Sequence, residues 1–176
     1  MITAMALTNT KDDPFYQKRF LRQSPSENPT VLQLGGSDPA MLRNAVKIVL
    51  ASQEMYGRWE GINLNCGCPS DKVTLKGCFG ARLMESPALV GECVKEMMEE
   101  AASVPQGPQI SVKCRIGVDD NDDYEDLLNF VKTVHEISDC QVFQVGSRSF
   151  NSGLLVKAPA CTHFRSARVA RFILPC

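Results

Sequence analysis

Short apolar runs rich in β-branched residues alternate along this chain with longer stretches whose apolar residues recur at helical spacing. The clearest runs are residues 30–34 (TVLQL), 61–65 (GINLN), 109–114 (QISVKC) and 141–145, and residues 2–5 resemble a fifth that precedes them. A parallel pair of strands needs a crossover connection, usually a helix, so this alternation is typical of a parallel sheet. The pattern therefore predicts an α/β fold, either doubly wound or closed as a (β/α)8 barrel.

The helices have recognisable starts. Asp38 is a good N-cap for a helix over residues 38–53, and Pro87 suits the first turn of the next. The acidic run over residues 119–126 is expected to open a third helix. Negative charges stabilise the positive end of a helix dipole, and this explains the run better than a metal site does.

Chain length limits the fold further. A complete (β/α)8 barrel takes about 250 residues, and this chain has 176. The fold class expected is therefore a partial TIM barrel with four to five parallel strands and intervening helices. A hydrophobic content of 44% supports a packed core, and the net charge of −1 excludes a generally basic protein that coats nucleic acid. No apolar run approaches the roughly 18 residues that span a bilayer, so no membrane association is expected.

The charge balance reverses near the carboxyl end. Residues 151–176 hold four basic side chains and no acidic one, whereas the first 150 residues hold 15 basic and 20 acidic side chains. The strand–helix rhythm also stops there. We expect residues 1–153 to form the barrel part and residues 154–176 a divergent basic tail that is poorly ordered.

Polar side chains gather where the expected strands end, the edge of a parallel sheet that carries active sites. They are Gln33, Asn63, Asn65, Cys68, Lys113, Arg115, Ser147 and Arg148. Lys113 alternates with apolar neighbours on its strand, so it is predicted to face the barrel interior if those neighbours face the helices.

Cys68 lies in the sharpest local motif, Asn65-Cys66-Gly67-Cys68-Pro69. A proline keeps the residue before it extended, so the Cys68 thiol is held in place. A protonated thiol can act as a general acid, and a thiolate as a nucleophile; a structural role is the alternative. Cys66 is interpreted as structural. The spacing of the two cysteines does not fit zinc, and no metal site is expected. The eight cysteines, in a chain that lacks signal-peptide features, indicate a reducing compartment.

At these residues the chain resembles the tRNA-dihydrouridine synthases, in particular their A-type branch. The resemblance covers residues 1 to about 155 and rests on ENPTVLQLGGSDP (27–39), INLNCGCPSDKV (62–73), GCFGARLM (77–84) and SVKCRIGVDDNDDYE (111–125). It implies an FMN-type (β/α)8 barrel that reduces the C5–C6 bond of uridine in tRNA, with NADPH as the reductant of the flavin. It also implies a cytoplasmic protein, with an organelle address left open.

The resemblance assigns roles to single residues. Cys68 would be the general acid that protonates uracil C5, and Asn65 would orient the base. Gln33 and Lys113 would bind the isoalloxazine, and Arg115 would line the same pocket. Arg148, a further candidate for binding the cofactor, matches the arginine of the family's His-Ala-Arg motif. The histidine of that motif is absent here. The chain resembles a synthase truncated at both ends, so we expect it to be weak or inactive alone. Two alternatives stay open: another FMN barrel acting on free pyrimidines, and a non-catalytic fragment.

Overall fold

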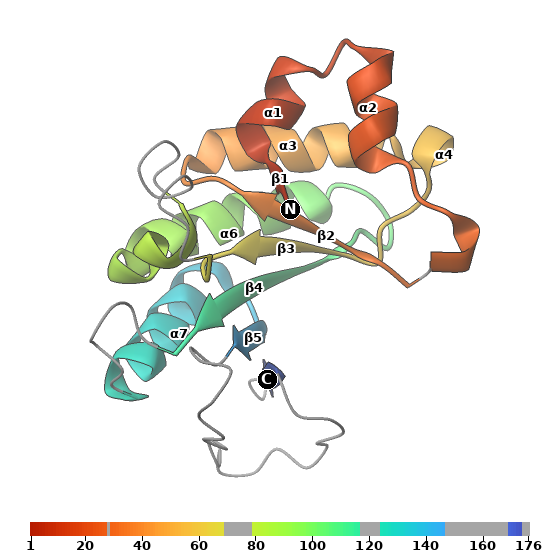
Figure 1. Cartoon of the computed structure of the whole chain (residues 1–176). Helices are drawn as coiled ribbons and strands as arrows, with labels where there is room; N and C mark the ends of the chain where they lie inside the picture. Colours follow the sequence, from red (N-terminus) through yellow and green to blue (C-terminus); the bar gives the residue numbers. More distant parts are fainter. Residues whose placement is uncertain (28, 69–78, 117–123, 147–168, 174–176) are drawn as a thin grey trace.

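The protein forms one curved sheet with helices on one side of it (Figure 1). The computed structural model describes residues 1–27, 29–68, 79–116, 124–146 and 169–173. The strands follow the order of the sequence across the sheet, and the first five are parallel. They are β1 (Ile2–Thr3), β2 (Val31–Gly35), β3 (Gly61–Asn65), β4 (Gln109–Arg115), β5 (Val142–Gly146) and β6 (Val169–Ile173). This architecture confirms the predicted α/β fold with five parallel strands.

Helices connect the parallel strands. The α-helices are α1 (Ala4–Asn9), α2 (Pro14–Leu21), α3 (Pro39–Ala51), α4 (Gln53–Tyr56), α6 (Pro87–Ala101) and α7 (Tyr124–Ser138), with 3-10 helices η1 (Pro25–Glu27) and η2 (Gly80–Glu85). The Asp38 carboxylate accepts a hydrogen bond from the Met41 N–H at 2.7 Å, which confirms it as the N-cap of α3. Pro87 is the first residue of α6, as predicted.

Two expected boundaries were wrong, for identifiable reasons. The strand expected over residues 2–5 ends at Thr3, because the Thr3 hydroxyl accepts a hydrogen bond from the Ala6 N–H and so starts α1. The helix expected over residues 38–53 ends at Ala51, where the Ser52 hydroxyl donates to the Val49 carbonyl and a separate turn, α4, follows. The remaining predicted strands agree with the structure within one residue at each end.

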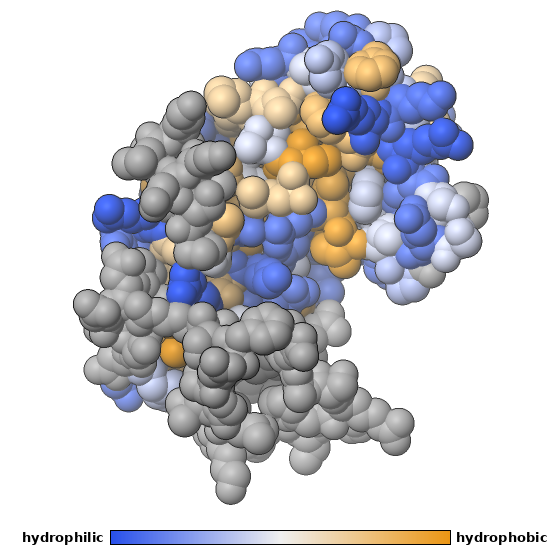
Figure 2. Space-filling view, in the orientation of Figure 1, coloured by the Kyte–Doolittle hydropathy of each residue, from blue (hydrophilic) through white to orange (hydrophobic). Residues whose placement is uncertain are grey.

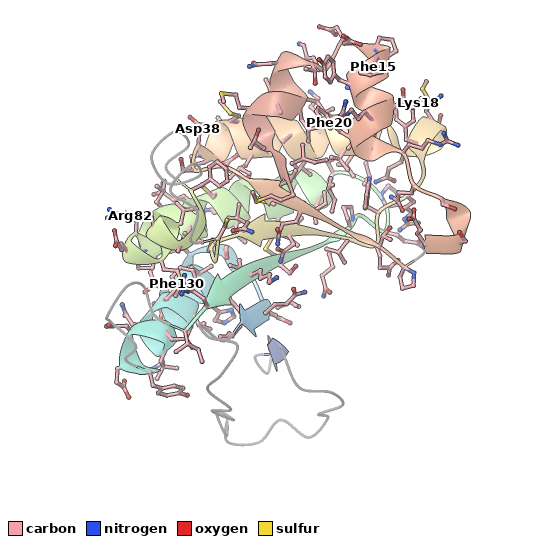
Figure 3. All side chains as sticks on the ribbon, viewed as in Figure 1. Phe15, Lys18, Phe20, Asp38, Arg82 and Phe130 are labelled. Atoms are coloured by element: carbon pink, nitrogen blue, oxygen red, sulfur yellow. The ribbon has the colours of Figure 1, made fainter. Side chains whose placement is uncertain are left out.

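Several elements were not predicted, and α2 and β6 are the two that add most to the fold. Helix α2 begins at Pro14, where the Asp13 carboxylate accepts a hydrogen bond from the Phe15 N–H. Phe15 is 63% exposed and points away from the sheet, whereas Phe20 packs against the core (Figure 3). Strand β6 lies antiparallel to β5 within the expected tail. Most of residues 154–176 lies outside the described residues, so the disposition of that segment stays a prediction.

The core lies between the sheet and the helices. Alternate residues of β2, β3, β4 and β5 face this side, and these residues are buried. They are Leu32, Leu34, Ile62, Leu64, Ile110, Val112, Cys114, Phe143 and Val145. Leu42 and Val46 of α3, Met97 of α6 and Phe130 of α7 cover them. The residues that alternate with them point to the opposite face of the sheet, which we call the inner face. Among the described residues, no helix is long and apolar enough to cross a membrane.

Candidate active site

The inner face of the sheet carries two rows of polar side chains. Strand register places Gln33 of β2 beside Asn63 of β3, and Asn63 beside Ser111 of β4. One step nearer the carboxyl ends, Asn65, Lys113 and Gln144 lie beside one another on β3, β4 and β5. Figure 2 shows hydrophilic side chains gathered over β4 in the middle of this face, below hydrophobic side chains over β1 and β2.

Direct hydrogen bonds join these side chains across three strands. Gln33 Nε2 donates to Asn63 Oδ1 at 2.8 Å, and Asn63 Nδ2 donates to Ser111 Oγ at 3.0 Å. Asn65 Nδ2 donates to Gln33 Oε1 at 2.9 Å. Asn63, Asn65 and Ser111 are buried, and each has at least one partner. The polar rows are therefore a connected network, as buried polar groups require.

Asn65 also holds the segment that carries Cys68. Its Oδ1 accepts hydrogen bonds from the backbone N–H of Gly67 at 3.2 Å and of Cys68 at 3.0 Å. An asparagine side chain that captures the backbone two and three residues ahead fixes a turn. The turn directly after β3 is thus built by the last residue of that strand.

Further backbone contacts fix the same turn. The Cys66 N–H donates to the Lys113 carbonyl at 2.7 Å, which continues the pairing of β3 with β4 for one more residue. The Cys68 carbonyl accepts from the Ala81 N–H at 2.9 Å. Cys68 is therefore held through both its backbone N–H and its carbonyl, at the carboxyl end of the sheet.

The two cysteines of the motif have different surroundings. Cys66 is fully buried, and burial raises the pKa of its thiol well above the ordinary value, with smaller contributions from the neighbouring Cys114 and Cys93. Cys68 is half-buried and lies three residues after the inner-face residue Asn65, which accepts its backbone N–H. The Cys66 thiol is thus shielded from solvent, whereas Cys68 is partly exposed.

The remaining candidates are partly placed. Lys113 and Arg115 are half-buried on β4, two residues apart and hence on the same face. The alternate residues Ile110, Val112 and Cys114 of the same strand are buried against the helices, which confirms the predicted inward orientation of Lys113. In the described part of the chain, Lys113 has no ion-pair partner. Arg148 and Ser147 lie outside the described residues.

Phe79 covers the end of β2. A side chain added to Gly35 would place its Cβ 2.4 Å from the Cε2 atom of the Phe79 ring. Phe79 is buried, and Gly80 after it has φ +82°, a conformation that glycine adopts without strain. The absence of a side chain at Gly35 leaves room for the Phe79 ring. The segment that begins at Phe79 can therefore lie over the end of the sheet, where the Ala81 N–H bonds to the Cys68 carbonyl.

Three inner-face residues received no role from the sequence. The sequence indicates Asn63 only as a polar residue near a strand end, and it gives Ser111 and Gln144 no role. Strand alternation could have marked two of them, because Asn63 and Ser111 lie two residues from the polar residues Asn65 and Lys113 of the same face. Gln144 has no such polar neighbour on its strand. Within the described residues, no group of three or more His, Cys, Asp or Glu side chains is placed to hold a metal ion.

A curved parallel sheet with polar side chains and a held cysteine at its carboxyl end defines a (β/α)-barrel-type protein with its site at the strand ends. The family model described as Dihydrouridine synthase (Dus) matches residues 1–159, and the chain belongs to this family.

Individual relatives agree with this assignment. The chain is 46% identical over 158 residues to the tRNA-dihydrouridine(20/20a) synthase of Pasteurella multocida (strain Pm70). It is 42% identical over 158 residues to the proteins of the same name from Escherichia coli strains CFT073 and K12. These matches cover 89% of this chain and 41–43% of the relatives, so the chain spans less than half the length of the curated relatives it matches.

Proposed function

We propose that this chain supplies the reducing site of a tRNA-dihydrouridine synthase, which converts uridine in tRNA to dihydrouridine with FMN as the redox group and NADPH as its reductant. Family membership and the names of the relatives support the reaction class. The observation that carries the proposal is the held position of Cys68: its backbone is fixed at both polar groups beside a polar inner face.

The inner face has the chemistry that a flavin ring needs. An isoalloxazine presents carbonyl oxygens and ring nitrogens that require donors and acceptors, and it becomes more negative on reduction. Gln33 offers a second amide N–H and a second lone pair beyond those used by its neighbours, and Lys113 offers a cation. We assign these two residues to the flavin, and Arg148 to the same group. When bound and reduced by NADPH, FMN would supply a hydride to uracil C6.

Cys68 supplies the other hydrogen. Reduction of the C5–C6 bond adds a hydride at C6 and a proton at C5, and the Cys68 Sγ–H is the donor that we assign to C5. The resulting thiolate then recovers its proton from solvent. A positioned general acid contributes about 10²–10⁴-fold to such a step. Cys66 does not compete for this role, because it is fully buried.

Asn65 is assigned two tasks. Its oxygen is committed to the turn, and one amide hydrogen is committed to Gln33. The second amide hydrogen remains for a carbonyl oxygen of uracil, which is the orienting role that the resemblance implies. Arg115, on the same face as Lys113, is assigned to the substrate side of the pocket.

The substrate has to leave its base stack to meet this surface. A uracil stacked within tRNA cannot present C5 to a half-buried thiol, so the base has to be extruded into the site. The proposed location is the cytoplasm, where tRNA would meet the enzyme.

A chimera tests the proposal. Residues 1–159 of this chain replace the matching segment of the Pasteurella multocida relative, and unmodified tRNA is incubated with the chimera, FMN and NADPH. Dihydrouridine, measured by mass spectrometry of the digested tRNA, should appear. A folded, flavin-loaded chimera that reduces free uridine but leaves tRNA unmodified would instead identify a reductase of free pyrimidines.

A further inference from the structure

The hydrogen bonds of the inner face all run in one direction. The backbone N–H of Cys68 donates to Asn65, Asn65 donates to Gln33, Gln33 donates to Asn63, and Asn63 donates to Ser111. We call these four side chains the amide relay: Asn65, Gln33, Asn63 and Ser111. The relay crosses from the Cys68 turn through β3 and β2 and ends on β4.

The direction is fixed at the Cys68 end. A backbone N–H can only donate, and two of them, from Gly67 and Cys68, meet the Asn65 side chain. Asn65 must therefore turn its oxygen toward the turn and its nitrogen toward Gln33. The same logic applies at each following amide, because a donor that faces a donor forms no bond. Gln33 consequently presents Oε1 to Asn65 and Nε2 to Asn63.

Ser111 closes the relay. Asn63 is 2% exposed, so its Nδ2 hydrogen needs a partner within the protein, and the Ser111 hydroxyl accepts it. Ser111 is itself 5% exposed. A hydroxyl is the smallest side chain that supplies an acceptor at this place in the strand. Without it, the last amide hydrogen of the relay is buried and unpaired, which is costly.

We infer that Asn63 and Ser111 are positioning residues. Acting through Gln33 and Asn65, they fix which amide atoms face a ligand on the inner face. They also fix the position of Cys68. The functional consequence rests on the proposed function, in which Gln33 contacts the flavin and Cys68 protonates the base. The physical coupling between Ser111 and Cys68 is independent of that function, and it can be measured without any ligand.

The test compares two substitutions of the same shape in the full 176-residue chain. Ser111→Thr keeps the hydroxyl, and Ser111→Val replaces it with a methyl group. Hydrogen exchange of the Gly67 and Cys68 amides is measured by NMR on the chain alone. Loss of one buried hydrogen-bond partner predicts about tenfold faster exchange of these two amides in Ser111→Val, and near wild-type exchange in Ser111→Thr. A role in packing alone would affect both variants equally.

A double-mutant cycle separates the relay from a general loss of stability. In an Asn65→Ala background the relay is cut, so Ser111→Val should no longer alter Gly67 and Cys68 exchange. Ser138→Ala is the matched control, because Ser138 is a buried serine outside the relay whose hydroxyl donates to the Val134 carbonyl and accepts from the Cys140 N–H. It should leave both amides unchanged in either background.

Each result decides the inference. Equal exchange in the Thr and Val variants, or an equal effect of Ser111→Val with and without Asn65, would overturn it. If Ser111→Val does not fold, Asn63→Leu provides the same test, with the same tenfold acceleration expected and wild-type exchange contradicting it. Because no tRNA, NADPH or flavin is present, failure here leaves the proposed reaction standing. An inactive chimera likewise leaves the relay standing.

Discussion

Asn65 Oδ1 accepts the backbone N–H of Cys68 at 3.0 Å, so the residue assigned to orient the uracil also fixes the residue assigned to protonate it. Orientation of the base and placement of the acid are thereby linked through one side chain. A catalytic group held by its neighbours loses little entropy when the substrate arrives, which is how positioned groups lower a barrier.

The first prediction concerns that link. Asn65→Ala removes the acceptor of the Gly67 and Cys68 amides and frees the turn. We expect alkylation of Cys68 by iodoacetamide, followed by peptide mass spectrometry, to become faster by about 3–10-fold for each of the two hydrogen bonds lost. Asn65→Asp keeps an acceptor oxygen and should react at close to the wild-type rate. Identical rates in the alanine and aspartate variants would show that the side chain does not hold Cys68.

The second prediction concerns the contact between Gly35 and Phe79. Gly35→Ala would place a Cβ 2.4 Å from the Phe79 ring, so the ring has to move. Overpacking of this kind costs about 1–3 kcal/mol of the free energy of unfolding, measured by urea denaturation. Gly36→Ala is the matched control, because its nearest neighbours would lie at 3.4 Å. Phe79→Leu should recover part of the loss, and a Gly35→Ala variant as stable as Gly36→Ala would exclude the contact.

The third prediction concerns alkaline stability. Burial raises the pKa of the Cys114 thiol to about 12, from an ordinary value of 9.0. Between these values the unfolded chain releases a proton that the folded chain keeps, so the free energy of unfolding falls as pH rises from about 9 to 12. The contribution of this thiol is fully present below pH 9. One such group contributes a slope of up to about 1.4 kcal/mol per pH unit.

Cys114→Ala should remove that part of the slope. Val112→Ala truncates a buried side chain of the same strand without removing a titrating group, and should retain the wild-type slope. Denaturation curves between pH 8 and pH 11 give the comparison. Parallel slopes for both variants would mean that Cys114 ionises in the folded protein as it does in the unfolded chain.

The fourth prediction concerns the ion pairs between α3 and α6. Arg43 contacts Glu96 at 2.6 Å, Glu99 at 3.1 Å and Glu100 at 3.2 Å. These carboxylates, with the hydrogen bond to Glu96 first, raise the pKa of Arg43 further above its ordinary value. Arg43→Ala leaves three carboxylates facing one another and should lower the thermal midpoint, by less at high salt because the charges are half-exposed.

Arg82→Ala is the comparison for Arg43, since it removes one exposed pair with Glu85 on a single 3-10 helix. Its effect should be small. If both variants melt at the wild-type temperature in low salt, the Arg43 cluster does not stabilise the packing of α3 on α6.

The fold was predictable because its signals are local. Asp38 caps α3 by bonding to Met41, three residues away, and Pro87 is suited to the first turn of a helix. Alternation along β4 places Lys113 and Val112 on opposite faces of the sheet. Helix α2 was missed because its exposed aromatic residues show no apolar stripe, and β6 because pairing with β5 rather than its own pattern makes it a strand.

The site was predictable only in part. Cys68, Asn65, Gln33 and Lys113 follow from strand ends and from the resemblance, and the structure brings Asn65, Gln33 and Cys68 into one network. Ser111 lies in mid-strand, 48 residues from the Asn63 side chain that needs it. Only strand register shows that two such distant residues are neighbours, so sequence spacing alone does not reveal the relay.

The most direct test of the central claim compares the two cysteines of one motif. In the chimera that carries residues 1–159, Cys68→Ala should lose about 10²–10⁴-fold in tRNA reduction, the contribution of a general acid, while flavin is retained. Cys66→Ala, which alters only a buried thiol, should keep most of the activity. Dihydrouridine formed per minute under single-turnover conditions is the measurement. Wild-type reduction by Cys68→Ala together with loss in Cys66→Ala would contradict the account.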